Sequence, residues 1–268
     1  MKAHTTAPES CSIAEVQAAL LGVSTTPRAE AYARMMHQAV PRAWGLAHAG
    51  RDWVGALLAQ LRLWGLTQVA DLGCGMPRRT PATAPHPVDT HEYALAVRMR
   101  RCAYLDIDPA VVEHRRSGVA PYQGGAALAD LTDPAQVRAG LAACGIDPHQ
   151  PTVLILGWVL ALLDDDQALG VLASLPTLVA PDSYVAVSHP AGWGPWSALM
   201  TRTTGARVRF RSAPHLLDLM TQSGMVPHQG PTPVTAWPVP ACPTPGTDVL
   251  CALARIRPTT VAVGGSDR

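Results

Sequence analysis

Apolar residues recur along this chain in two alternating patterns, one typical of helices and the other of buried strands. Short apolar runs bounded by turn residues predict five strands, at residues 69–72, 102–107, 126–129, 152–156 and 184–188. Between these runs the apolar residues follow helical spacing or come after a residue that caps a helix. A repeated unit of strand and helix is typical of an α/β fold with a mostly parallel sheet.

Further elements are predicted on both sides of this repeat. Before the first strand, helical spacing covers residues 28–44 and 51–64, with Gly65 where a C-terminal cap would stand. The small, polar residues ahead of them predict a weakly ordered arm with one short helix near 13–21. After a proline-rich stretch, the apolar residues 248–256 predict a strand of a late β-hairpin.

Short polar residues mark several helix starts. Asp108 and Asp133 each precede a proline, the residue type favoured at the first helical position, and Ser212 supplies a third cap. We interpret the acidic run 164–166 as a solvated helix start stabilised by the helix dipole, with a metal triad as the alternative. We predict no metal site.

The length of the chain indicates a single main domain. A chain of 268 residues can bury one substantial core, so we expect one α/β domain with an extension rather than two independent domains. Residues 1–64 are predicted to form an N-terminal arm and helical extension on the lid or substrate side. Residues 65–258 are predicted to form the ligand-binding α/β domain, and residues 259–268 a disordered tail.

Composition and charge narrow the range of partners. A formal net charge of +1 and the absence of a basic run give no electrostatic case for nucleic acid. The six cysteines lack CxxC pairing and metal-finger spacing, which is typical of reduced thiols in a cytosolic protein. No signal-peptide pattern is present, and no apolar run reaches the ~18 residues of a membrane span. We therefore expect a soluble, cytoplasmic protein with a small-molecule substrate, and a homodimer is compatible with the sequence.

The ends of the first two predicted strands carry the most informative residues. Asp71 is followed by the turn Gly73-Cys74-Gly75, and glycine lets backbone N–H groups approach a ligand closely. Asp106 ends the second strand, where a carboxylate can accept both hydroxyls of a ribose. We favour Asp106 over Asp108 for this role because Asp108 is already explained as a helix cap. Together these residues predict a bound adenosine.

The spacing of the glycines limits the ligand further. A dinucleotide fingerprint has a third glycine where Arg78 stands here, so a pyrophosphate and an NAD-dependent oxidoreductase are less favoured. The shorter turn fits a ligand without phosphates, such as S-adenosylmethionine; a tight turn with no ligand is the alternative. After the third strand, Asp130 or the backbone of Leu131 could contact the adenine amino group, unless Asp130 is a turn or cap acid.

Longer segments carry a resemblance to a known family. The chain contains, in this order, VADLGCGMP, VDTHEYALAV, YLDIDPAVVEHRR, ALADLTDP, LILGWVLALLDDD, SYVAVSHPAG and RVRFRSAPHLLDLM. In order and spacing, over about residues 66–240, these resemble an actinobacterial family of S-adenosylmethionine-dependent methyltransferases long catalogued as a domain of unknown function. The resemblance implies a Rossmann-like class I methyltransferase fold, with a seven-stranded, mostly parallel sheet, an antiparallel last strand and helices on both faces.

The resemblance also implies a cofactor, S-adenosyl-L-methionine, and the residues that bind it. The residues concerned follow the carboxyl ends of the first four strands. They are Asp71, Gly73 and Gly75 for the methionine part, Asp106 with the adjacent Ile107 for the ribose, Asp130 and Leu131 for the adenine, and residues 157–160, including Gly157 and Trp158, for the wall after the fourth strand.

Candidate catalytic and substrate residues are fewer. Methyl transfer from a sulfonium requires alignment and only a weak base, for which His91, Glu92 and His189 are candidates. A positioning role competes for His91 and Glu92, and a satisfied structural role competes for both histidines. Tyr32 and Trp193 are candidate substrate contacts, because aromatic rings can stack on an apolar substrate or face a cation, although such residues are often part of the core.

The chain departs from the family pattern on the substrate side. Residues 31–49 replace a segment rich in tyrosine and glycine, Ala161-Leu162 replace an aromatic or His-Phe pair after the fourth strand, and the proline-rich loop 76–88 is longer than expected. The leading hypothesis is methylation of a small molecule in specialised metabolism. The alternatives are attack at another carbon of the sulfonium, which transfers or cyclises the aminobutyrate chain and releases methylthioadenosine, and a non-catalytic cofactor-binding protein.

The assignment of the ribose can be tested directly. We expect Asp106→Ala to weaken cofactor binding, measured by calorimetry, far more than it lowers the free energy of unfolding, because the carboxylate binds the ligand at a strand end. Unchanged affinity in this variant would show that the ribose lies elsewhere.

Overall fold

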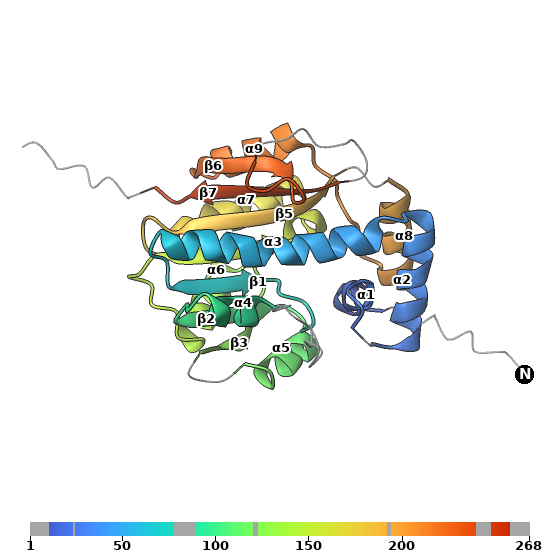
Figure 1. Cartoon of the computed structure of the whole chain (residues 1–268), viewed down its shortest axis with the longest axis horizontal. Helices are drawn as coiled ribbons and strands as arrows, with labels where there is room; N and C mark the ends of the chain where they lie inside the picture. Colours follow the sequence, from blue (N-terminus) through green and yellow to red (C-terminus); the bar gives the residue numbers. More distant parts are fainter. Residues whose placement is uncertain are drawn as a thin grey trace, which may run out of the picture.

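One seven-stranded sheet runs through the protein (Figure 1). The structure is a computed structural model that describes residues 11–23, 25–77, 89–119, 123–191, 194–239 and 248–257. In sheet order the strands are β3 (Gly124–Leu128), β2 (Arg101–Asp106), β1 (Gln68–Leu72), β4 (Thr152–Gly157), β5 (Tyr184–Ala191), β7 (Asp248–Arg255) and β6 (Val226–Pro233). β7 pairs antiparallel with β5 and β6, and the other pairs are parallel. The expected sheet, including its antiparallel last strand and late hairpin, is confirmed.

The parallel register brings the carboxyl ends of five strands to one edge of the sheet. Leu72 pairs with Leu105, Asp106 with Leu128, and Gly157 with Ser188. The chain order reverses at β1, which pairs with β2 on one side and with β4 on the other. In open α/β sheets, ligands bind at the carboxyl edge where the strand order reverses.

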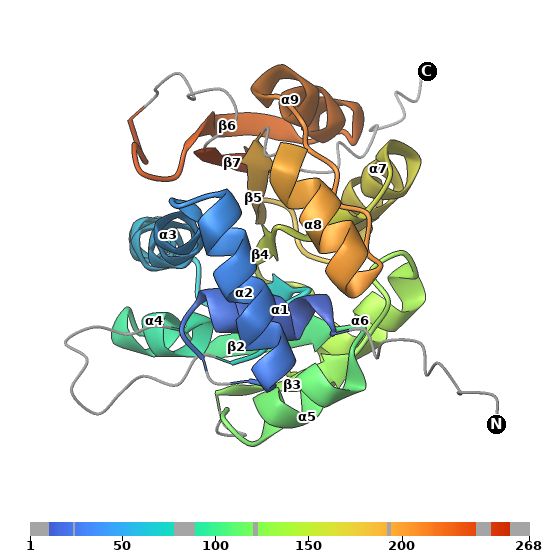
Figure 2. The ribbon, with the colours of Figure 1, turned by 90° about the vertical axis from the view of Figure 1, so that its right-hand side faces the viewer.

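Helices cover both faces of the sheet (Figure 2). One face packs against α3 (Ala43–Leu63), α4 (Thr90–Ala96) and α5 (Pro109–Arg116). The opposite face packs against α6 (Pro134–Ala143), α7 (Asp165–Ser174), which leads into the short 3-10 turn η2 (Leu175–Thr177), and α9 (Ala213–Gln222). The helices α1 (Ile13–Leu20), α2 (Pro27–Ala39) and α8 (Gly194–Thr204) gather at one end of the sheet (Figure 1). The N-terminal helices therefore lie where the sheet presents its strand ends.

The helices before β1 exist as predicted, but their limits differ. Helical spacing predicts 28–44 and 51–64, whereas α2 ends at Ala39 and α3 already begins at Ala43. Val40 precedes a proline, which disfavours helical backbone at that residue, and it has φ −137° and ψ 88°. The break therefore falls at the proline. The short helix expected near 13–21 is confirmed as α1.

Capping residues fix the starts of the helices around the strand ends. Asp108, Asp133 and Ser212 accept hydrogen bonds from the first turns of α5, α6 and α9, as predicted. Asp164 caps α7, so the acidic run begins a helix. The part of the chain that the structure describes contains no group of histidine, cysteine or acidic residues that could hold a metal ion. Its helices include none long and apolar enough to cross a membrane.

Candidate cofactor site

Two adjoining cavities lie at the carboxyl edge of the sheet, at the reversal of the strand order. Their volumes are about 310 Å³ and about 40 Å³. Gln17, Gly73, Gly157 and Trp158 line both, so the two spaces share a wall. The smaller cavity extends from this wall toward α3, between the helical extension and the strands.

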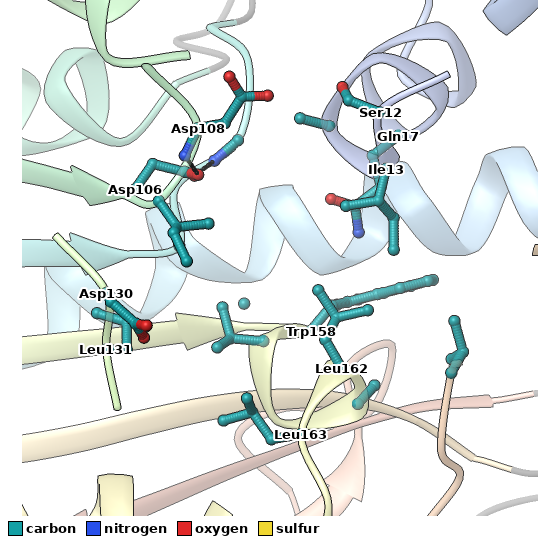
Figure 3. A pocket seen from close by; sticks show the side chains of 18 of the residues that line it. Ser12, Ile13, Gln17, Asp106, Asp108, Asp130, Leu131, Trp158, Leu162 and Leu163 are labelled. Atoms are coloured by element: carbon teal, nitrogen blue, oxygen red, sulfur yellow. Dashed lines mark hydrogen bonds between the residues drawn. The ribbon is translucent and has the colours of Figure 1, made fainter. Parts of the chain in front are cut away.

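The larger cavity has carboxylates at one end and apolar side chains on most of its other walls (Figure 3). Asp106 ends β2 and Asp130 follows β3, and Figure 3 shows them on one side of the space. Ile13 and Gln17 of α1 stand opposite Asp106. Another wall is made by Trp158 and by η1 (Val159–Leu162), the 3-10 turn that follows β4.

Asp106 is held in a defined orientation by the backbone. Its Oδ2 accepts a hydrogen bond from the Gly75 amide at 2.9 Å, and its Oδ1 accepts one from the Asp108 amide at 3.0 Å. The Cys74 thiol also lies 3.8 Å from Oδ2 and is a second, weak donor to that oxygen. Each carboxylate oxygen has two acceptor positions, so Oδ1 keeps one for a ligand. The side chain lines the larger cavity, as its predicted role requires.

The backbone of the turn after β1 favours glycine at two positions. Gly73 and Gly75 have φ of +69° and +61°, in the left-handed region that side chains disfavour. A Cβ on Gly73 would also collide with the side chain of Val159. The missing Cβ therefore allows Val159 of η1 to pack directly against this turn.

A buried arginine binds the backbone of the glycine turn. This residue was not identified from the sequence. The side chain of Arg115, in α5, is 1% exposed. It donates hydrogen bonds to the backbone carbonyls of Gly75 at 2.8 Å, Cys74 at 2.9 Å and Met76 at 3.0 Å. Its Nη1 lies 2.6 Å from Asp89 Oδ2, in a buried ion pair. One guanidinium thus fixes three consecutive carbonyls of the turn.

The charge of Arg115 is secured by its neighbours. Burial lowers the pKa of Arg115, but Asp89 and Tyr104 raise it by more, and the net shift is upward. The guanidinium also lies 4.2 Å from the centre of the Tyr104 ring. Asp89 caps α4, so the same ion pair connects the glycine turn to the start of that helix.

His91 and Glu92, two of the predicted bases, make contacts at this helix start. Glu92 accepts a hydrogen bond from the Asp89 amide and completes a capping box. The His91 amide donates to the Tyr104 hydroxyl, which also lies 2.9 Å from His91 Nδ1. Neither side chain lines either cavity. Their observed contacts are those expected of the positioning role, which is the alternative to a role as a base.

His189, the third predicted base, is fully buried on the far side of β5. It is 0% exposed, and its Nε2 accepts a hydrogen bond from the Arg211 amide at 3.1 Å. Burial, with the nearby charges of Arg211 and His215, lowers the pKa of His189 to about 3. Its neighbour Ser188 lines the smaller cavity instead, because alternate side chains of a strand point to opposite faces.

The smaller cavity contains an ion pair beside the glycine turn. Asp71 is 2% exposed and accepts a hydrogen bond from the Thr90 hydroxyl at 2.7 Å. Arg51, from α3, places Nη1 3.5 Å from Asp71 and donates from Nη2 to the Cys74 carbonyl at 3.0 Å. Burial raises the pKa of Asp71, and Arg51, Arg115 and Thr90 act in the opposite direction. Both signs of charge therefore meet at one wall of this cavity.

The remaining predicted residues divide into three groups. Ile107, Asp130, Leu131, Gly157 and Trp158 line the larger cavity, although Asp130 also accepts two hydrogen bonds from Thr132, as in the turn alternative. Tyr32 accepts hydrogen bonds from Arg28 and lines neither cavity. Trp193 lies outside the described residues.

The contribution of α1 is a second feature that the sequence analysis did not identify. The larger cavity is lined by Ser12, Ile13, Ala14 and Gln17, although the sequence predicts a weakly ordered arm in this segment. Ser12 and Glu15 form a capping box, a local signal that could have indicated an ordered helix.

The geometry fits S-adenosylmethionine. The larger cavity lies at the lower end of the about 300–1,000 Å³ typical of ligand sites, and the smaller one continues it. Asp106 lines the larger cavity, and its Oδ1 retains an acceptor position for a ribose hydroxyl. The paired charges of Arg51 and Asp71 could hold the two ends of an α-amino acid group.

The buried histidine generates a prediction about pH. The unfolded chain binds a proton to His189 near pH 6.5, whereas the folded protein binds it only near pH 3. Its contribution to stability is therefore present above pH 6.5 and is lost as the pH falls below that value, at up to about 1.4 kcal/mol per pH unit. Urea unfolding at pH 7 and about pH 5 should show this loss, and His189→Gln, whose amide oxygen can accept from the Arg211 amide without titrating, should reduce it. An unchanged pH dependence in this variant would contradict the assignment.

Solved structures of other proteins share the fold. A DUF574 family protein from Streptomyces avermitilis MA-4680 has a TM-score of 0.77 at 24% sequence identity and covers 93% of this chain and 98% of its own. A proposed methyltransferase from Thermobifida fusca YX has a TM-score of 0.77 at 21% identity and covers 92% of this chain and 96% of its own. No curated protein matches the chain. At these identities the likeness shows the fold.

The sequence itself shows the family. A sequence model described as S-adenosyl methyltransferase matches residues 5–249, which include both α1 and the strand ends that line the two cavities. The cofactor of this family is S-adenosyl-L-methionine, which agrees with the chemistry of the site. The chain thus belongs to the S-adenosyl methyltransferase family and is a class I, S-adenosylmethionine-dependent methyltransferase.

Proposed function

We propose that this enzyme methylates a small molecule by in-line displacement at the methyl carbon of its cofactor, with the sulfur of S-adenosylhomocysteine as the leaving group. The observation that carries the proposal is the cavity at the strand ends, with carboxylates at one end and largely apolar walls provided by α1, η1 and α8. The acceptor is proposed to be a small molecule rather than a nucleic acid, because a formal net charge of +1 and the absence of a basic run give no electrostatic case for nucleic acid. The setting, cytoplasmic specialised metabolism, is inferred from the cysteine pattern and the ordered motifs of the sequence.

The cofactor is proposed to extend across both cavities. Asp106 accepts the ribose hydroxyls, and Asp130 with Leu131 contacts the adenine. The glycine turn contacts the methionine part, whose amino acid group enters the smaller cavity. There Arg51 binds the carboxylate and Asp71 the ammonium group. This arrangement places opposite charges against each end of the zwitterion.

Catalysis is proposed to depend on alignment. The bound cofactor supplies an electrophilic methyl group on a sulfonium. Trp158 lies between the two cavities, with backbone φ of +65°, which is rare for a residue other than glycine and is fixed here by the hydrogen bond from its amide to the Ser188 carbonyl. Its ring could face the sulfonium by a cation–π contact. His91, Glu92 and His189 do not reach the cavities, and we propose no base among the described residues.

Product analysis tests the reaction. After incubation with S-adenosylmethionine and a panel of apolar amines, thiols and phenols, mass spectrometry should detect S-adenosylhomocysteine together with a methylated acceptor. Methylthioadenosine as the product would contradict methyl transfer and would support attack at another carbon of the sulfonium. Tight cofactor binding without turnover across the panel would support a non-catalytic role.

Truncated ligands test the placement of the amino acid group. Arg51→Met should lower the affinity for S-adenosylhomocysteine, measured by calorimetry, at least about tenfold, because a hydrogen bond to a charged group contributes about 1.5–3 kcal/mol. Methylthioadenosine, which lacks the amino acid group, should bind this variant as it binds the wild type. Arg62→Met, in the same helix but outside both cavities, is the matched control. An equal loss for both ligands would place the amino acid group elsewhere.

A further inference from the structure

A second buried arginine lies behind the wall formed by η1. Arg211, in the segment between α8 and α9, is 2% exposed. Its Nη1 donates to the carbonyl of Leu160, and its Nη2 donates to the carbonyl of Leu163 at 2.8 Å. Its Nε donates to Asp165 Oδ1 at 2.9 Å. Arg211 does not line the cavity, so it acts through the residues that it holds.

The backbone of the same segment adds to this contact. The Arg209 amide donates to the carbonyl of Ala161 at 2.7 Å. The Arg211 amide donates to Nε2 of His189, a residue of β5. The carbonyls of Leu160, Ala161 and Leu163 are thus all bound by one short segment, which attaches η1 to β5.

η1 depends on such external partners. A 3-10 turn of four residues leaves most of its own carbonyls without partners inside the turn, and a buried carbonyl without a partner is costly. The other side of the same turn carries Val159, Ala161 and Leu162, which line the larger cavity. The contacts of Arg211 therefore determine how far this wall stands from the carboxylates across the cavity.

The charge arrangement favours arginine specifically. Asp165 is the counterion, 56% exposed at the start of α7, and the hydrogen bond from Arg211 lowers the pKa of its carboxyl group. His215 lies 3.3 Å from the other oxygen of Asp165, and Arg209 contributes a further positive charge nearby. A planar guanidinium reaches two carbonyls and a carboxylate together, whereas an ammonium group is a point charge that cannot span them.

We infer that Arg211 is a positioning residue for the cofactor site, which holds the wall at Val159 to Leu162 in place for the adenosine part of the ligand. This inference rests on the proposed location of adenosine in the larger cavity. It does not depend on which carbon of the sulfonium is attacked.

Ligand binding tests the inference. S-adenosylhomocysteine and methylthioadenosine are titrated into Arg211→Met, Arg211→Lys and wild type, well below the melting temperature of each protein. Both ligands should bind both variants at least about tenfold more weakly, because the adenosine part is common to them, and lysine should not rescue the loss. This differs from Arg51→Met, which should affect S-adenosylhomocysteine alone. Arg255→Met, which removes an exposed ion pair with Asp182, is the control and should bind both ligands normally.

Three results separate positioning from a purely structural role. A lower melting temperature with unchanged affinity for both ligands would overturn the inference, as would full rescue by lysine. If Arg211→Met does not fold, Asp165→Asn keeps the test, because Asp165 is half exposed and its loss leaves the carbonyl contacts of Arg211 in place. Asp165→Asn should lower the affinity for both ligands by the same factor, which should be smaller than for Arg211→Met. Normal binding by both Asp165→Asn and Arg211→Lys would again overturn the inference.

Discussion

The guanidinium of Arg115 is the interaction on which the cofactor site depends. It binds three successive carbonyls of the turn after β1, and the Gly75 amide of the same turn donates to Asp106. Through Asp89 it also fixes the start of α4. Breaking such a buried pair typically costs about 3–5 kcal/mol, because a charge is left without a partner. The turn and the carboxylate of Asp106, for which we propose ribose binding, are thus fixed by the protein itself.

On the other side of the cavity, Arg211 likewise donates hydrogen bonds to buried backbone carbonyls. Loops that line a site have few hydrogen bonds of their own, and their buried carbonyls require donors. In both places a buried arginine supplies several donors from one planar group and is balanced by an acid at a helix start, Asp89 for Arg115 and Asp165 for Arg211. The result is a site whose walls are held by the scaffold, which supports catalysis by alignment.

The side chains that were candidate bases make structural contacts in this protein. Glu92 completes a helix cap, His91 contacts Tyr104, and His189 remains neutral because burial disfavours its charged form. Asp71 is buried beside Arg51. The chemistry of the site thus lies in its glycines, its strand-end carboxylates and one ion pair.

The sequence by itself determined the elements that depend on local preference: the strands, the caps at Asp108 and Asp133, and the left-handed glycine turn. It also indicated Asp106, because the end of a strand has a fixed place in a parallel sheet. Only the tertiary structure decided which side chains meet, as for Arg115 and the carbonyl of Gly75, 40 residues apart. It also placed α1 across the cavity. The face of β5 was likewise undecided in sequence, because neighbouring strand residues point to opposite sides and the packing of the helices determines which side faces the ligand.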